Sequence, residues 1–251
     1  MEEIELGPDG DIDDEWLEYE LNEWDEYALE AAVQLKEAHG GSVTVVTMGD
    51  EGTEETLRRC LAKGADEAVR IADEAIHEFD TVAKARVLAN VIEGFDESPD
   101  LVYTGLQAGD TVHAQAGGAM AAELELPFTS FIVALDYDPQ DEVAIVRREL
   151  EGGLEERREI EVPAVLGIQT GINDPRYASI REIRAARDKP LTVVAPRDRG
   201  LDVETISSWS KTRIDRLYEP ESEDLALIFE GSADETAADL VNTFEDIGVG
   251  V

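Results

Sequence analysis

The chain has 251 residues, of which 43% are hydrophobic, so it is long and apolar enough to bury a full core. Its 59 acidic residues against 21 basic ones give a formal net charge of -38, which opposes binding to nucleic acid or anionic lipid because both need basic neutralisation. No apolar run is long enough to cross a bilayer, so we expect a cytoplasmic protein without direct membrane insertion and without a nucleic-acid partner.

The first part of the chain is expected to alternate helices and strands. Residues 1–19 are acidic and are interpreted as a loop or hairpin remnant. Asn22 is a candidate N-cap, because apolar residues at helical spacing follow it. The elements expected after it are a helix that ends before Gly40, a strand over 42–48, a helix over 53–63, a strand over 68–71 and a helix over 79–95.

The stretch from Leu101 to Gly118 carries the strongest functional pattern. An apolar strand breaks at Gly105 and Gly109 and leads into a small-residue helix expected over 114–124. This arrangement is typical of a nucleotide site, because unpaired N–H groups at a helix start attract phosphate and glycine lets the backbone come close. Parallel sheets bind ligands beyond the carboxyl ends of their strands, which is where Met48 and this loop fall.

The second part of the chain adds strands and an extension. The expected elements are a strand over 128–135, a hairpin with arms over 143–150 and 154–162, a strand over 164–170, an Arg-rich short helix after Asn173-Asp-Pro, a strand over 191–194, an irregular stretch over 198–222, a strand over 225–231 and an amphipathic helix over 233–247. The predicted fold class is α/β: a parallel sheet with helices on both faces, Rossmann-like and adenine-nucleotide-binding, plus a hairpin and a C-terminal extension. Residues 1–197 are expected to form the nucleotide-binding domain, and residues 198–251 a C-terminal arm.

Other reactive residues give little signal. Cys60 lies within a helical pattern and is interpreted as packing, since one cysteine excludes an intramolecular disulfide and a multi-thiolate metal site. His113 lies in the glycine loop, where filling space or facing solvent is favoured over proton or phosphate chemistry. No Gly-x-Ser-x-Gly motif, Walker loop or Cys/His nucleophile pattern is found, which argues against hydrolases and kinases.

The acidic residues are spread along the whole sequence rather than gathered in one tail. We interpret this as a surface adapted to high salt, where bound cations screen the self-repulsion. An acidic docking face for a basic partner is the alternative interpretation.

Six segments together carry a family resemblance. They are Asn22-Glu-Trp-Asp-Glu26, Lys63-Gly-Ala-Asp66, Gly105-Leu-Gln-Ala-Gly-Asp110 with Gln115, Arg148 to Glu155, Val162-Pro-Ala-Val165, and Asn173-Asp-Pro-Arg-Tyr-Ala178. In this order, over nearly the whole chain, they resemble the beta (small) subunit of electron transfer flavoprotein. The family is heterodimeric: the alpha subunit makes most of the contacts to a redox-active FAD, and the beta subunit holds a second nucleotide, usually a structural AMP. The resemblance implies an electron-transfer subunit without bond chemistry of its own.

The resemblance also implies roles for particular residues. The implied partners are the alpha subunit, acyl-CoA or related flavin dehydrogenases as donors in fatty acid oxidation, and a membrane electron transfer flavoprotein quinone oxidoreductase as acceptor. Residues 162–187 resemble a recognition loop for dehydrogenases, in which the docking residues are Arg176, Tyr177, Ile180, Arg181 and Arg184. The implied cofactor-binding residues are Asn22, Glu23, Trp24, Asp25, Met48, Gly105, Gln107, Ala108, Gly109, Asp110, Thr111, Ala114, Gln115 and Ala116.

Three departures from the family pattern bear on these roles. The chain lacks the family's opening apolar strand, whose following turn contributes to the nucleotide pocket. Ala114 and Ala116 stand in the loop where the AMP-binding type has phosphate-binding side chains, so AMP and a second FAD both remain candidates and a bifurcating complex is possible. Ala185 and Asp188 thin the basic end of the recognition helix.

One alternative function is kept beside the electron carrier. A stand-alone adenine-nucleotide-binding module of the stress-protein type would share the alternating fold and the glycine loop. It would not explain the hairpin, the Asn173 to Ala178 segment or the C-terminal arm. We expect this arm to pack on the partner subunit, because so long an irregular stretch is uncommon inside a compact domain.

Overall fold

A computed structural model of the chain describes residues 6–7, 10, 12, 19–72, 79–218 and 227–248. The helices are α1 (Glu23–His39), α2 (Thr53–Ala62), α3 (Thr81–Glu93), α4 (Ala116–Glu123), α5 (Ile180–Ala185), α6 (Val203–Trp209) and α7 (Ala233–Asp246). The strands are β1 (Thr44–Met48), β2 (Glu67–Ile71), β3 (Leu101–Gly105), β4 (Phe128–Asp136), β5 (Val143–Leu150), β6 (Leu154–Glu161), β7 (Ala164–Ile168) and β8 (Leu191–Val194). The predicted α/β class is confirmed.

The chain divides into two units, which are described separately. Residues 16–214 form the first unit, which contains both sheets and α1 to α6. Residues 1–15 and 215–251 form the second unit, which contains α7. The isolated antiparallel bridge between Leu6 and Ile12 agrees with the hairpin interpretation of the N-terminal stretch, most of which lies outside the described residues.

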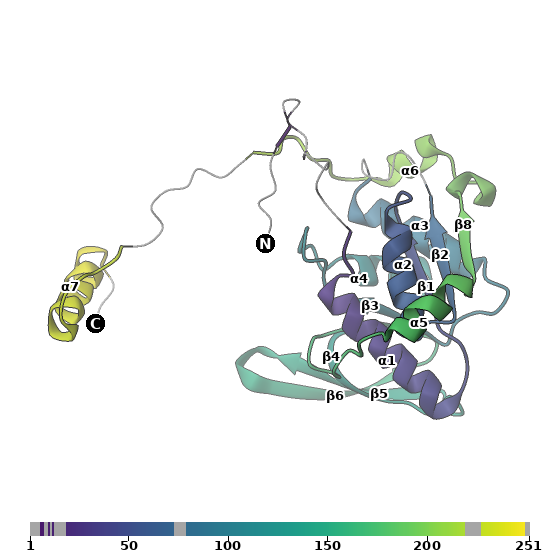
Figure 1. Cartoon of the computed structure of the whole chain (residues 1–251), viewed down its shortest axis with the longest axis horizontal. Coiled ribbons are helices and arrows are strands. Elements are labelled where there is room, and N and C mark those ends of the chain that lie inside the picture. The colour runs from purple at the N-terminus through teal and green to yellow at the C-terminus, as the bar shows by residue number, and fades with distance from the viewer. Residues whose placement is uncertain are drawn as a thin grey trace. The chain divides into compact units, whose positions relative to one another are not determined.

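The strands form two sheets rather than the single sheet expected. One is all parallel, in the order β1-β2-β8, and the other is mixed, in the order β3-β7-β4-β5-β6. In the mixed sheet β3, β7 and β4 are parallel, and the β5–β6 hairpin continues it in the antiparallel sense (Figure 1). All five residues of β7 are buried, as a continuous apolar run in a parallel sheet predicts.

Two helices each cover both sheets, on opposite faces. On one face α1 places Ala28 in the core cluster of β7 and β4, and Leu29 and Val33 in the cluster of α2 and β2. On the other face α3 packs Val87 against Ile71 of β2, and its alanines against β7 and α4. The two sheets are therefore halves of one layer between shared helices.

The first residues of the expected C-terminal arm contain the helix α6. The stretch expected to be irregular from Asp198 contains this helix, in which Ile206 is fully buried in the cluster of α3. The Arg86 guanidinium carbon lies 5.1 Å from the Trp209 ring centre. Residues 198–214 therefore add to the core of the first unit, and only residues 215–251 remain candidates for an arm.

The strand expected over 225–231 is not formed in its described part. Residues 227–230 are irregular, and Leu227 and Ile228 are 68% and 79% exposed. Residues 225 and 226 lie outside the described residues. The run is apolar enough for a strand, but propensity alone does not provide a neighbouring strand to pair with.

Candidate functional site

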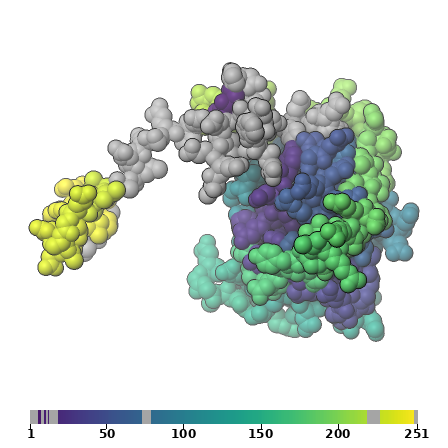
Figure 2. Space-filling view, viewed as in Figure 1, coloured from purple at the N-terminus to yellow at the C-terminus, as the bar shows by residue number. Residues whose placement is uncertain are grey.

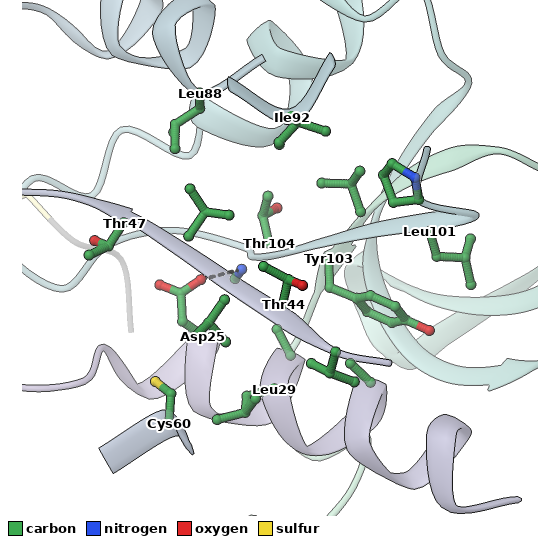
Figure 3. Close-up of a pocket in the computed structure, with 18 of the residues that line it drawn as sticks. Asp25, Leu29, Thr44, Thr47, Cys60, Leu88, Ile92, Leu101, Tyr103 and Thr104 are labelled. Carbon is green, nitrogen blue, oxygen red and sulfur yellow. Dashed lines mark hydrogen bonds between the residues drawn. The ribbon is translucent and has the colours of Figure 1, made fainter. Parts of the chain in front are cut away.

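A cavity of about 820 Å³ lies between β1 and β3 and extends to the carboxyl ends of both strands. Figure 3 shows Leu29 and Asp25 of α1 on one side of it, and Leu88 and Ile92 of α3 on the other. Cofactor sites commonly have about 300–1,000 Å³, so the volume suits a nucleotide. The cavity reaches the carboxyl ends of β1 and β3, where the sequence pattern predicted a ligand site.

Asn22 joins the start of α1 to the glycine loop after β3. Its side-chain N–H groups donate to the Gln107 carbonyl and to the Asp25 carboxylate, each at 2.8 Å, and its Oδ1 accepts from the Gly109 N–H at 3.1 Å. Asn22 occupies the N-cap position as predicted, but its side chain makes no capping hydrogen bond. The Asn22 side chain therefore fixes the glycine loop to the start of α1 and does not cap the helix.

Asp25 adds a second contact between the same elements. Its Oδ1 accepts a hydrogen bond of 2.7 Å from the Gly105 N–H, drawn as the dashed line in Figure 3. A Cβ on Gly105 would lie 2.7 Å from the Trp24 Cβ and 2.8 Å from the Asp25 backbone nitrogen. Residue 105 must therefore be glycine for α1 to approach this closely.

The rest of the loop is exposed and tightly turned. Thr111 N–H donates to the Asp110 carboxylate at 2.7 Å, and Val112 N–H closes a turn on the Ala108 carbonyl at 2.9 Å. Val112 and Ala114 have φ values of 54° and 51°, a conformation that non-glycine residues seldom adopt and that marks strained functional loops. The helix after it, α4, starts at residue 116 instead of 114 because of this turn.

The structure brings ten of the fourteen predicted cofactor-binding residues to the wall of the cavity. The four others are Glu23, which is exposed, Trp24, and the two loop residues Gly109 and Asp110. Trp24 donates from Nε1 to Gln169 at 3.0 Å, so its indole is tied to the end of β7. The ten residues on the wall are Asn22, Asp25, Met48, Gly105, Gln107, Ala108, Thr111, Ala114, Gln115 and Ala116.

Sequence reasoning missed three polar residues near this end of the cavity. Thr104 has a buried hydroxyl with no hydrogen-bond partner in the described structure. Thr81 lies 3.3 Å from the His113 ring, Oγ1 to Nδ1, and both line the cavity. Burial lowers the pKa of Lys84 against the opposing effects of Asp110 and Asp80. Asp80 caps α3, which starts at Thr81, but no sequence pattern placed the start of this helix beside the loop.

Arg176, predicted to dock partners, is bound within the chain instead. Its guanidinium contacts both oxygens of Glu30, at 2.7 and 3.0 Å, and both oxygens of Glu37, at 2.6 and 3.0 Å. Burial acts to raise the pKa of Glu30, but the hydrogen bonds from Arg176 outweigh it and hold that pKa below its usual value. The ion pairs fix the segment before α5 onto α1.

The other predicted docking residues lie on the surface. Tyr177 is 97% exposed and Ile180 is 71% exposed, while Arg181 and Arg184 also face solvent. In Figure 2 the side chains of this segment, in green, lie beside the blue surface of α2. The helix α5 starts with a capping box of Ser179 and Glu182, so its start is defined by its own sequence.

The remaining reactive groups lie outside the glycine loop. Cys60 is a buried free thiol in the core cluster of α2, where burial raises its pKa to about 12, so its interpretation as packing is confirmed. Among the described residues no group of His, Cys, Asp and Glu side chains is arranged to hold a metal ion. No helix in the described part of the chain is long and apolar enough to span a membrane.

Comparison with known proteins decides the family. Residues 10–199 match the electron transfer flavoprotein domain. The chain belongs to the electron transfer flavoprotein family, as a beta subunit. It is 41% identical to the electron transfer flavoprotein subunit beta of Methylophilus methylotrophus, over 98% of this chain and 93% of that protein.

Two further relatives are less similar than that protein. The electron transfer flavoprotein subunit beta of Bacillus subtilis is 36% identical, over 93% of this chain and 88% of its own length. The caffeyl-CoA reductase-Etf complex subunit CarD of Acetobacterium woodii is also 36% identical, over 90% of this chain and 86% of its own. The chain is therefore an electron-transfer protein, as the sequence resemblance implied.

Proposed function

We propose that this beta subunit pairs with an electron transfer flavoprotein alpha subunit to form an electron carrier. The pair takes electrons from flavin dehydrogenases, such as acyl-CoA dehydrogenases, and passes them to a membrane quinone oxidoreductase of the same system. The membership of the family, with full-length similarity to subunit beta proteins, supports this assignment. FAD, held mainly by the alpha subunit, supplies the electron-accepting chemistry when bound.

The strand-end cavity is proposed to hold a second nucleotide. Two features suit one: Gly105 lets the start of α1 pack against the loop, and Gln115 and Ala116 bring the start of α4, whose first-turn N–H groups a helix cannot satisfy by itself, to the cavity wall. The proposal rests mainly on the hydrogen bonds of Asn22 to Gln107 and Gly109. They hold the glycine loop in a fixed conformation at the wall of the cavity. The unpartnered Thr104 hydroxyl offers a further polar contact.

The identity of that nucleotide is proposed as a second FAD in place of AMP. Ala114 and Ala116 both line the cavity and carry no side-chain donor that could close over a single terminal phosphate. Their small size leaves room for the longer diphosphate of FAD. A second FAD would allow bifurcation, in which an electron pair is split between two acceptors, whereas AMP would only fill its pocket.

The exposed segment around α5 is proposed as the docking site for dehydrogenases. Tyr177 and Ile180 supply apolar area, and Arg181 and Arg184 supply cations on a strongly acidic chain. Arg176 positions this segment through its ion pairs to α1 and is not itself free to meet a partner. An aromatic and an aliphatic anchor beside arginines are typical of interface centres.

Residues 215–251 are proposed to pack on the alpha subunit. None of the described residues of α7 is buried, although Leu240 and Val241 in the helix and Ile247 at its C-cap leave apolar area exposed that a partner surface could cover. The excess of acidic residues is proposed as an adaptation to high salt.

Co-expression with the alpha subunit tests the proposed function. We expect a yellow heterodimer, because the flavin needs both subunits. A colourless chain that purifies alone with ATP bound would contradict it and would favour the stand-alone nucleotide-binding module.

A further inference from the structure

The segment before α5 has no regular secondary structure, so side-chain contacts decide where its residues lie. Residues 174–179 belong to no helix or strand, and among the described residues none of 174–178 makes a backbone–backbone hydrogen bond. Tyr177 is 97% exposed, so packing of its own ring does not fix its position. Docking of such a side chain costs conformational entropy unless other groups already hold it in place.

Both backbone groups of Arg176, the residue before this tyrosine, are bound by side chains of other elements. Its N–H donates to the Glu30 carboxylate of α1 at 3.3 Å, and its carbonyl oxygen accepts from Lys63 Nζ at 2.5 Å. Because the peptide unit is planar, the carbonyl of residue 176 and the N–H of residue 177 share one plane that ends at the Tyr177 Cα. The hydrogen bond from Lys63 therefore fixes the peptide unit that carries Tyr177.

The same lysine contacts the tyrosine ring. Its Nζ lies 5.7 Å from the centre of the Tyr177 ring, within the range of a cation–π interaction. The lysine side chain is only 14% exposed, so its ammonium group is largely withdrawn from water beside an exposed ring. One amine thus contacts both the backbone before Tyr177 and its side chain.

The position of Lys63 is fixed by two helices. It is the C-cap residue of α2, and its Nζ forms an ion pair with Glu26 of α1, 2.5 Å from Oε1. A lysine at the end of a helix commonly interacts with the last carbonyls of that helix, which would be a purely local role. Here the oxygens that it contacts belong to α1 and to the segment before α5.

A second lysine provides a structural counterpart without contact to this segment. Lys36 of α1 donates to the Gly64 carbonyl at 2.7 Å and to both oxygens of Asp66 at 2.9 Å, and its side chain is 19% exposed. Like Lys63 it joins α1 to the end of α2, but none of its hydrogen bonds in the described structure reaches residues 173–179. A difference between the two lysines therefore separates positioning of the segment from support of the helix pair.

We propose that Lys63 is a positioning residue for the docking of flavin dehydrogenases, because its ammonium group sets the position of Tyr177 before the partner binds. The inference rests on the proposed docking function of the segment around α5. The far end of that segment is held separately, since Arg58 donates to the carbonyls of Ala186 and Lys189 at 2.9 and 2.8 Å. Lys63 accordingly acts on the Tyr177 end of the docking surface and not on α5.

Heterodimers with the alpha subunit that carry Lys63→Met, Lys36→Met, Tyr177→Ala, or Lys63→Met together with Tyr177→Ala test the proposal. An acyl-CoA dehydrogenase supplies the electrons, and KM and kcat are measured with the heterodimer as the varied substrate. Lys63→Met should raise KM about three- to tenfold and leave kcat unchanged, because order is lost at the binding surface alone. Lys36→Met should leave both constants unchanged, and all four variants should keep their FAD.

The double variant should have the KM of Tyr177→Ala alone, because a lysine that acts through the tyrosine has no effect once the ring is removed. Additive effects of the two substitutions would overturn the proposal. An equal rise of KM in Lys36→Met and Lys63→Met would also overturn it, since support of the helix pair would account for both.

Two outcomes distinguish this inference from the proposed docking function. A raised KM in Tyr177→Ala with an unchanged KM in Lys63→Met would overturn the inference alone. An unchanged KM in Tyr177→Ala would overturn docking through this tyrosine and the inference with it.

A second variant guards against loss of the fold. Lys63→Met leaves the Glu26 carboxylate without its partner, and an uncompensated charge that is partly buried lowers stability. Glu26→Gln combined with Lys63→Met removes that charge, and we expect the same rise in KM from this folded protein. A KM equal to that of wild type in the combined variant would overturn the proposal.

Discussion

The Asp25 carboxylate accepts a 2.7 Å hydrogen bond from the Gly105 N–H and so fixes the start of α1 at the carboxyl end of β3. The contact is possible because Gly105 has no side chain: a Cβ would lie within 2.9 Å of three atoms of Trp24 and Asp25. The glycine loop after β3 begins at this residue. Its geometry therefore depends on a helix that starts more than seventy residues earlier in the chain.

Substitution Gly105→Ala should separate α1 from the loop. The added methyl group meets the Trp24 Cβ at 2.7 Å, and overpacking of this kind costs about 1–3 kcal/mol. We expect lower stability in urea and loss of the beta-site nucleotide. The matched control is Gly118→Ala in α4, whose Cβ would lie 3.4 Å from its nearest contact, the Phe128 Cε1, which is an ordinary van der Waals distance. Equal nucleotide content in the two variants would contradict this role of Gly105.

Substitution Asn22→Ala should loosen the glycine loop while α1 persists, because the side chain bonds Gln107 and Gly109 and does not cap the helix. Loss of a hydrogen bond that leaves partners unsatisfied costs about 1–3 kcal/mol. We expect unchanged helix content by circular dichroism and faster nucleotide loss on dialysis. Glu51→Ala, at an exposed position that does not line the cavity, is the control and should retain nucleotide. A drop in helix content with normal retention would favour a capping role instead.

The ion pairs of Arg176 should give a pH-dependent contribution to stability. The pKa of Glu30 is lowered in the fold from its ordinary value of 4.5, so the contribution is complete above that pH and is lost as the pH falls and the carboxylate takes up a proton. Arg176→Gln should cost about 1–3 kcal/mol near neutral pH, less than a fully buried pair because the arginine is partly exposed.

Urea unfolding of wild type and Arg176→Gln between pH 7 and pH 3 measures this difference. The gap between the two proteins should close below pH 4.5, the ordinary value for Glu30. A gap that stays constant over that range would show that packing, and not ionisation, accounts for the effect. In Arg176→Gln the rate of electron transfer from a dehydrogenase should also fall, to the extent that the segment before α5 is displaced from α1.

Substitution Ile180→Glu should weaken the reaction with dehydrogenases without harming the fold. The side chain is 71% exposed, so its replacement removes apolar contact area and adds a negative charge to a proposed interface while the core is unaffected. We expect a raised KM for the dehydrogenase, with unchanged FAD content and melting temperature. Val203→Glu, 47% exposed at the start of α6, is the control and should leave KM as it was.

Salt should stabilise the protein. At a formal charge of -38 self-repulsion grows as ionic strength falls, because the Debye length increases from about 3 Å at molar salt to about 10 Å at a tenth of that. Melting temperatures over a potassium chloride series should therefore rise with concentration. A melting temperature that does not depend on salt would contradict the proposed adaptation.

Much of the fold could be predicted because local patterns carry it. The hairpin arm over 143–150 and the strand over 191–194 are found at the predicted residues, since alternation and turn residues define them locally. The helix predicted over 53–63 ends one residue earlier, at Ala62. These elements need only their own sequence and a nearby turn.

What could not be predicted depends on contacts between distant segments. Ile206 is buried because it packs on α3, whereas Leu227 is exposed because no strand among the described residues lies beside it. Hydrophobic periodicity in the sequence reveals neither contact. Arg176 looked like a surface cation because Glu30 and Glu37 lie some 140 residues away in sequence. The site was located from strand ends and glycines, but the link of Asn22 to Gly109 required the structure.

The nucleotide content of the purified heterodimer tests the central claim most directly. The complex is denatured, and the FAD and AMP released are measured per complex, for wild type and for Gly105→Ala. The proposed function predicts two FAD and no AMP in wild type, and one FAD in the variant. One FAD and one AMP would show that the argument from Ala114 and Ala116 is wrong. One FAD and no second nucleotide in wild type would contradict a nucleotide site at the carboxyl ends of β1 and β3.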